Sequence, residues 1–208
     1  MLRQFWLSLG IACLLGGQAW GAEGDALPPS HSVKPELYAT GFEFAEGPTL
    51  DHTGHLYVVN YRGNGNIGRI AADGTASVFC TLDLLAPLEG RKAQANGLKL
   101  DSEGRLIVAD AGAGRLLRIS LDGKMAEVLA ERCEGERFKS INDVALDLAG
   151  NIYFSDPGGS SAENPIGAVY RYDIQTKKVT RIAKDLAFPN GLGVTPDQKH
   201  LVVAESQR

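Results

Sequence analysis

Cysteine is scarce in this sequence, and its placement excludes several kinds of protein. Three cysteines occur among 208 residues, and no two of them form a CxxC pair. The spacing therefore excludes a zinc cluster or a thioredoxin-like redox motif. Beyond the first 21 residues only Cys80 and Cys133 are left. Two cysteines in an exported domain can form a disulfide, and the sequence leaves open whether these two do.

An excess of positive charge is also lacking. The chain has 21 Lys and Arg against 25 Asp and Glu, a net charge of -4, which argues against nucleic acid or an anionic membrane as the main partner. Heptads and low-complexity tracts are absent as well. What is present, 44% hydrophobic and 22% charged residues, is typical of a globular domain with one sizeable core.

A long hydrophobic run occurs at the N-terminus. Arg3 precedes an apolar stretch over residues 5–15, and Ala19-Trp20-Gly21 fits a small-residue cleavage site. We predict a secretory signal peptide at 1–21 and a polar linker at 22–35. The mature protein is then periplasmic or secreted, without a membrane contact. A retained N-terminal anchor is the alternative.

A pattern L-D-x-x-G-x-L/I recurs about every 50 residues from residue 50 onward. The copies are "LDHTGHLYVVN" (50–60), "LDSEGRLIVAD" (100–110) and "LDLAGNIYFSD" (146–156), followed by "VTPDQKHLVVAE" (194–205) with one extra residue in its turn. A period of this length, built from short strands and glycine-rich turns, predicts an all-β fold, a β-propeller. Residues 36–208 then supply about three and a half blades. Because a propeller ring must close, we expect a partial propeller.

One glycine motif points elsewhere and is rejected. "GNGNIG" (63–68) matches the G-x-G-x-x-G dinucleotide loop, but "RIAADG" after it predicts a strand. A pyrophosphate site needs a helix N-terminus at that place.

The aligned copies share one position, occupied by Asp51, Asp101, Asp147 and Thr195. Five residues before it stands in each copy a side chain that carries an oxygen: Glu46, Asn96, Asn142 and Asn190. Each begins the first strand of a blade, and the first strands line the channel of a propeller. Radial symmetry should therefore bring the four together at one mouth, where carboxylate and amide oxygens suit Ca²⁺. Ordinary turn chemistry is the alternative, and it weighs most for Asn96.

The second strands end in a further polar set: Asn60, Asp110, Asp156 and Glu205. These should lie at the same mouth because antiparallel strands reverse direction. We expect them to cap loops or to bridge blades, with support of the metal ligands as the alternative. Asp143 should point to the other side of its strand from Asn142, and we expect it to be structural.

These motifs resemble the gluconolactonase family, which includes the senescence marker protein regucalcin and luciferin-regenerating enzyme. The resemblance rests on "AEGP" (45–48), "ANGLKLDSEGRLIVAD" (95–110), "INDVALDLAGNIYFSDP" (141–157) and "FPNGLGVTPDQKHLVVAES" (188–206). It implies a six-bladed propeller with a divalent metal, most suitably Ca²⁺, in the channel.

The resemblance also implies roles for individual residues. Glu46, Asn142 and Asn190 look like metal ligands, and Asn96 and Asn142 look like substrate-binding residues. Ser140 stands where some members have a pocket arginine, and Ile141 replaces a familiar proline. The Asp that serves such enzymes as metal ligand and proposed base belongs to a later blade, so the catalytic residue stays unassigned.

Two functions are therefore compared. The first is an exported, metal-dependent hydrolase of sugar lactones, in which a bound cation polarises the carbonyl. The second is a non-catalytic or strictosidine-synthase-like propeller that binds a small molecule. The converging Glu and Asn favour the first, whereas the missing base favours the second and predicts weak activity for these 208 residues.

Overall fold

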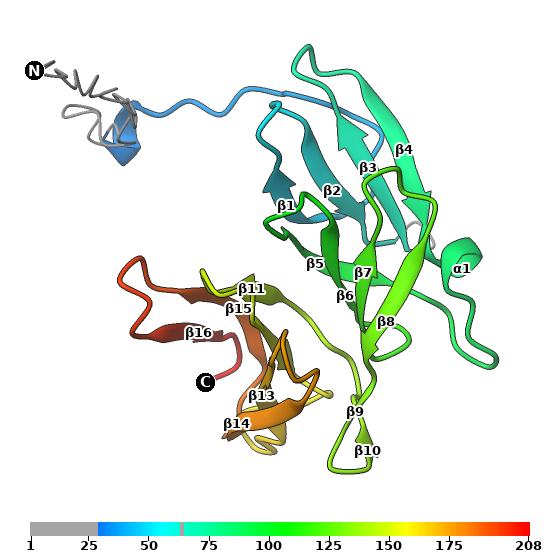
Figure 1. Cartoon of the computed structure of the whole chain (residues 1–208). Coiled ribbons are helices and arrows are strands. Elements are labelled where there is room, and N and C mark those ends of the chain that lie inside the picture. The colour runs from blue at the N-terminus through cyan, green and yellow to red at the C-terminus, as the bar shows by residue number, and fades with distance from the viewer. Residues whose placement is uncertain (1–28, 63–64) are drawn as a thin grey trace, which may run out of the picture. The chain divides into compact units, whose positions relative to one another are not determined.

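The protein is built almost entirely from antiparallel sheets, as the computed structural model shows for residues 29–62 and 65–208 (Figure 1). The strands of blade 1 are β1 (Ala45–Leu50), β2 (Leu56–Asn60), β3 (Asn66–Ile70) and β4 (Ala76–Thr81); those of blade 2 are β5 (Ala95–Leu100), β6 (Leu106–Asp110), β7 (Arg115–Ile119) and β8 (Ala126–Ala130). Blade 3 contains β11 (Val144–Leu146), β12 (Ile152–Asp156), β13 (Gly167–Tyr172) and β14 (Val179–Leu186), and blade 4 is the pair β15 (Pro189–Val194) and β16 (Leu201–Glu205). The predicted count of about three and a half blades is confirmed.

Each recurring L-D-x-x-G segment forms the hairpin between the first two strands of a blade. In blade 2 the Asp101 carboxylate accepts hydrogen bonds from the N–H groups of Glu103 and Arg105, at 3.0 and 2.9 Å. Gly104 closes the turn with φ 78°, a backbone conformation that glycine adopts without steric cost. In blade 4 the longer turn places Gln198 in the left-handed region instead, at φ 61°.

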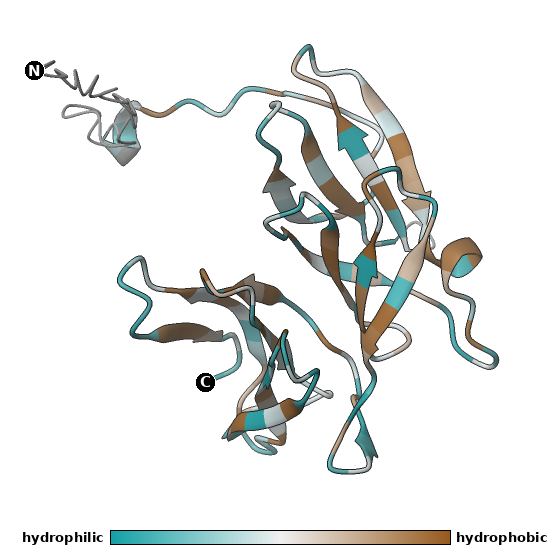
Figure 2. Ribbon diagram, viewed as in Figure 1, coloured by the Kyte–Doolittle hydropathy of each residue, from teal (hydrophilic) through white to brown (hydrophobic). Residues whose placement is uncertain are grey.

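Blade 2 packs on both of its neighbours, so the side chains of β6 and β7 are almost all buried, on both faces of the sheet. Figure 2 shows hydrophobic residues along much of these strands. Leu106 and Val108 of β6 join a core shared with blade 1, whereas Ile107 and Ala109 of the same strand join a core shared with blade 3. The period of two in a strand sends alternate side chains to opposite faces. A sheet that is covered on both faces by other sheets is the packing that a propeller requires.

The core between blades 2 and 3 contains an aromatic cluster. Phe138 lies edge-on to Phe154, with ring centroids 5.0 Å apart, and Tyr170 stacks on Phe154 at 5.4 Å. Such pairs add about 0.5–1.5 kcal/mol to what area burial contributes. Phe138 belongs to the connection before blade 3, so this contact fixes the segment that leads to Asn142.

Two smaller elements lie in the connections between blades. The helix α1 (Leu82–Leu85) follows blade 1, and a hairpin of β9 (Arg132–Cys133) with β10 (Glu136–Arg137) follows blade 2. Neither was predicted from the sequence. The strand β3 occupies the place where a dinucleotide loop needs a helix, which agrees with the rejection of that motif.

Residues Tyr38–Arg208 form one compact unit. In the described residues before it, 29–37, a short 3-10 helix spans Ser30–Ser32. The predicted signal peptide at 1–21 lies outside the described residues, as does the first half of the predicted linker, residues 22–28. No helix in the described part of the chain is long and apolar enough to cross a membrane. Cys80 and Cys133 are both buried and free, so they do not form a disulfide.

Candidate functional site

The four predicted site residues lie at the starts of the first strands, as expected. Glu46, Asn96 and Asn190 belong to β1, β5 and β15, and each lies where the pairing with the second strand shifts register. Asn142 precedes β11 and donates its backbone N–H to Ser155 O at 2.8 Å. Asn96 is buried, and the other three are half-buried. These register shifts mark β-bulges, which bend the strand and change the direction of its side chains locally.

The backbones around these residues contact one another from blade to blade. A Cβ on Gly47 would overlap the carbonyl oxygen of Asn96, and it would lie 2.9 Å from the Cα of Gly97. The N–H of Gly97 in turn donates to Asn142 O at 2.8 Å. Gly47 and Gly97, which follow Glu46 and Asn96, therefore allow neighbouring blades to approach closely, and the segments of Glu46, Asn96 and Asn142 follow one another in one row.

Asp143 extends this row to blade 4. Its Oδ2 accepts a hydrogen bond from the N–H of Leu192 at 3.2 Å, and its Oδ1 lies where a Cβ on Gly97 would be. Burial raises the pKa of Asp143 above its ordinary value, which hydrogen bonds from the N–H groups of Val144 and Leu192 and the charge of Lys99 only partly offset. Asp143 thus connects three blades, a larger part than sequence reasoning gave it. The one sequence feature that could have indicated this role is that Asp143 directly follows the candidate Asn142.

The polar ends of the second strands hold the segments that lead to the candidates. Each accepts a hydrogen bond from a backbone N–H two or three residues before a candidate, at 2.7–2.9 Å. The pairs are Asn60 with Glu43, Asp110 with Gln94, Asp156 with Ser140, and Glu205 with Ala187. The loop-capping role predicted for them is confirmed, and their position makes them supports for the candidate site.

Two of these supports are stronger than the others. Asp156 also accepts the N–H of Lys139, at 2.8 Å. Asp110 forms a buried ion pair with Arg115, whose Nη2 lies 2.7 Å from Oδ2, and Arg115 also donates to Ala86 O at 2.8 Å. A buried carboxylate with this many donors is rigid, because each lost bond would leave an unsatisfied group.

The donor set fits a hard cation better than a soft one. Glu46, Asn142 and Asn190 offer one carboxylate and two amides, and oxygen donors suit Ca²⁺. Within residues 29–62 and 65–208, no group of three or more His, Cys, Asp or Glu side chains is placed to hold a metal. Coordination by the three predicted ligands, and substrate contact by Asn96 and Asn142, stay predictions.

Residues 44–208 match the family model described as the SMP-30/Gluconolactonase/LRE-like region. Among curated proteins, a gluconolactonase from Zymomonas mobilis is 24% identical over 189 residues, covering 85% of this chain and 53% of the relative. The protein strictosidine synthase-like 6 of Arabidopsis thaliana is 38% identical over 122 residues, covering 53% of this chain and 32% of the relative. The chain thus spans at most about half the length of these two relatives.

Solved structures show the same fold. A gluconolactonase from Xanthomonas campestris superposes with a TM-score of 0.67 at 28% identity, covering 80% of this chain and 56% of the other. A calcium-binding regucalcin from Agrobacterium tumefaciens superposes with a TM-score of 0.60 at 18% identity, covering 80% of this chain and 52% of the other. The predicted propeller fold is confirmed.

Proposed function

Because the chain belongs to the SMP-30/gluconolactonase/LRE-like family, we propose that it acts as a metal-dependent hydrolase of sugar lactones. Lactonases and gluconolactonases are among its relatives, which supports a lactone hydrolase family. The finer assignment is supported by one observation: the backbone segments of Glu46, Asn96 and Asn142 contact one another from blade to blade, and Asp143 joins them to blade 4. Glu46, Asn142 and Asn190 are the proposed ligands of a divalent cation, most suitably Ca²⁺.

The residues of this chain bind and orient the substrate in this proposal. When bound, the cation acts as a Lewis acid on the lactone carbonyl. Asn96 is 8% exposed, so its amide has little freedom to rotate and can hold a hydroxyl of the sugar in one place. Asn142 lies beside it through the hydrogen bond from Gly97. Fixed dipoles of this kind stabilise developing charge without reorganising.

The supports described above keep this geometry rigid. Asp110 and Asp156 bind the backbone immediately before Asn96 and Asn142, and Asp143 connects three blades behind them. Catalytic sites need positions held within about 0.5 Å. No general base is assigned in this chain, since the resemblance implies an Asp from a later blade.

A second candidate is a propeller that binds a small molecule without hydrolysing a lactone. The 38% identity to a strictosidine synthase-like protein favours it, because that identity is higher than the identity to the gluconolactonases. Both candidates place the ligand at the same mouth. Only the chemistry at the carbonyl distinguishes them.

The test combines metal binding with lactone opening. Ca²⁺ is titrated calorimetrically into the protein and into Glu46→Gln, with Glu103→Gln as matched control, because Glu103 lies in an exposed turn at the far end of blade 2. Hydrolysis of an aldonolactone is followed by proton release with Ca²⁺ and with a chelator. We expect Glu46→Gln to weaken Ca²⁺ binding strongly and the chelator to abolish hydrolysis. Ca²⁺ binding without hydrolysis would favour the second candidate, and hydrolysis that ignores the chelator would refute the metal.

Export is proposed on the sequence of residues 1–21. N-terminal sequencing of the protein from the periplasm or medium should begin near Ala22. A chain that keeps residues 1–21 would support the retained anchor instead.

A further inference from the structure

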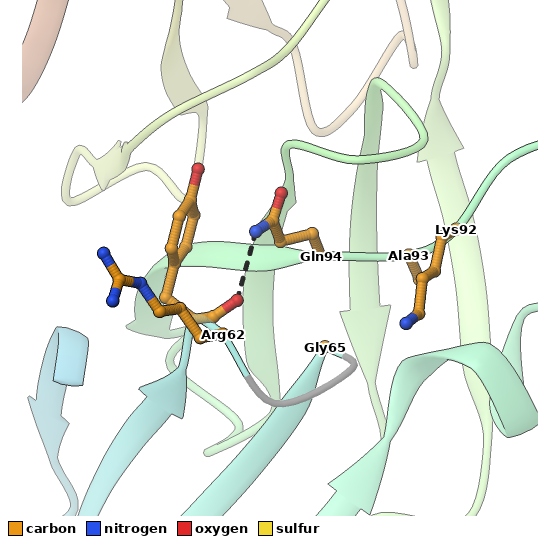
Figure 3. A pocket seen from close by; sticks show the side chains of 6 residues that line it. Arg62, Gly65, Lys92, Ala93 and Gln94 are labelled. Atoms are coloured by element: carbon orange, nitrogen blue, oxygen red, sulfur yellow. Dashed lines mark hydrogen bonds between the residues drawn. The ribbon is translucent and has the colours of Figure 1, made fainter. Parts of the chain in front are cut away.

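A pocket of about 160 Å³ lies between blades 1 and 2 (Figure 3). Its lining residues are Tyr61, Arg62, Gly65, Lys92, Ala93 and Gln94. We infer that this pocket binds an anionic group, a carboxylate or a phosphate, on the sugar part of the substrate. The inference rests on the proposed lactone hydrolysis and names the class of lactone that the site prefers.

The lining residues Tyr61 and Gln94 lie at the same end of blades 1 and 2 as the candidate site. Asn60, at the end of β2, pairs with Ala45 beside Glu46, and Tyr61 follows it directly. Gln94 stands two residues before Asn96 on the segment entering β5. At about 3.3 Å per residue in an extended chain, the backbones of Gln94 and Asn96 are about 7 Å apart. This span is comparable to the length of an extended six-carbon chain. One sugar acid can therefore reach both.

The wall formed by residues 92–94 is held rigidly. The N–H groups of its second and third residues donate to carboxylate oxygens of Asp83 and Asp110, at 2.7 and 2.9 Å. Gly65 and Gly112 approach its backbone so closely that a Cβ on either would clash with it. Anion binding by such a wall costs little ordering, which is the benefit of a preorganised site.

The opposite wall is positioned through Phe44. The Arg62 guanidinium carbon lies 5.2 Å from the centroid of the Phe44 ring, a cation–π contact that fixes the guanidinium plane. The Tyr61 N–H donates to Phe44 O at 3.2 Å, and the Tyr61 carbonyl accepts the Gln94 side chain at 3.1 Å (Figure 3). Phe44 itself has φ 59°, which a bulky residue adopts only when its surroundings impose it.

The chemistry of the lining favours an anion. Arg62 and Lys92 each bring one positive charge to the lining, on opposite sides of Gln94 (Figure 3). None of the six lining residues is acidic, although the whole chain has a net charge of -4. Arginine offers paired donors that match a carboxylate or phosphate. A neutral hydroxyl needs acceptors as well as donors and would use this lining less fully.

The test compares lactones that differ only in charge. KM and kcat are measured for a neutral aldonolactone and for matched lactones with a terminal carboxylate or phosphate. The variants are Arg62→Gln and Lys92→Gln. The control is Lys124→Gln, because Lys124 lies in the turn between β7 and β8 at the far end of blade 2.

We expect the protein to have a lower KM for a charged lactone than for the neutral one. Each pocket variant should raise the KM for the charged lactone roughly 10- to 100-fold, as losing a charge-assisted bond does, with a much smaller effect on the neutral lactone. The carboxylate and phosphate arms show which anion is preferred. Equal effects on charged and neutral lactones, or no effect, would overturn the inference while leaving lactone hydrolysis intact.

A failure of the proposed function is recognised separately. If no lactone is hydrolysed, a phosphorylated open-chain sugar acid is titrated calorimetrically into the protein and the same variants. Binding that is lost in Arg62→Gln and Lys92→Gln but kept in Lys124→Gln would preserve the anion pocket without the hydrolase. Absence of binding to the unaltered protein would overturn it.

Discussion

Gly97 occupies a crowded position of the candidate site, and replacing it with alanine tests the contact between blades 2 and 3. Its φ is not in the left-handed region, so alanine meets no backbone strain there. The obstacle is space: the new Cβ would overlap Asp143 Oδ1 and lie 2.6 Å from the Cα of Asp143 and 3.0 Å from Asn142 O. Two of these three atoms are backbone and cannot rotate away.

The magnitude follows from these distances. Ordinary contact begins at 3.4 Å, so the backbone of Asp143 must move by about 0.8 Å from Gly97. Overpacking of this kind costs about 1–3 kcal/mol, and weakening the 2.8 Å bond from Gly97 N–H to Asn142 O adds about 1 kcal/mol. We expect Gly97→Ala to lower the free energy of unfolding by about 2–4 kcal/mol. It should also weaken Ca²⁺ binding through Asn142.

Gly193 provides the matched control. It also lies in a first strand, β15, but no atom lies within 4 Å of an added Cβ. Because alanine reduces the entropy of the unfolded chain, Gly193→Ala should be neutral or slightly stabilising. Urea unfolding followed by circular dichroism and a Ca²⁺ titration measure both effects. If the two variants unfold at the same urea concentration and bind Ca²⁺ equally, the close approach of blades 2 and 3 at Asn142 is wrong.

Three further outcomes are expected. Asp156→Ala should cost about 2–4 kcal/mol in urea unfolding, because the N–H groups of Lys139 and Ser140 lose their acceptor, and unchanged stability would contradict the support role. Burial alone would raise the pKa of Asp51, but hydrogen bonds from its turn outweigh burial and lower the pKa to about 2. The ionised carboxylate therefore stabilises the fold above the unfolded pKa near 4, and this stabilisation is lost as pH falls toward 2. Asp51→Asn should reduce the loss in free energy of unfolding between pH 4 and pH 2 by about 1 kcal/mol. Burial raises the pKa of Cys80 to about 12, so Cys80 should resist alkylation at pH 8 until the protein unfolds, and rapid labelling of the native protein would refute its burial.

The repeated hairpins could be predicted from the sequence because their causes are local. The Asp101 carboxylate and Gly104 act within five residues, so strand boundaries around them follow from the motif. The placement of the four candidates at the starts of the first strands could be predicted too, since a repeat places equivalent residues at equivalent positions. The helix α1 spans only Leu82–Leu85, too short for any hydrophobic period to reveal it.

The remaining features depend on contacts between blades. Asp143 receives its hydrogen bond from Leu192, far along the chain, and no local pattern indicates that pairing. The left-handed conformations of Phe44 and Phe188, at φ 59° and 54°, are equally hidden, because phenylalanine disfavours them in isolation. Each stands two residues before a candidate ligand, Glu46 or Asn190. The tertiary structure therefore imposes strain at positions that sequence propensity would leave extended.

The alternation along β6 has a consequence for how blades communicate. Leu106 and Ile107 are adjacent in the chain but belong to different cores. A substitution at the first loosens the contact with blade 1, whereas one at the second loosens the contact with blade 3. Stability in such an array is transmitted from neighbour to neighbour rather than through one common centre. The strand β6 thus couples blade 2 to each neighbour through a separate core. Which interface a substitution destabilises depends on whether it falls on one residue or on the next.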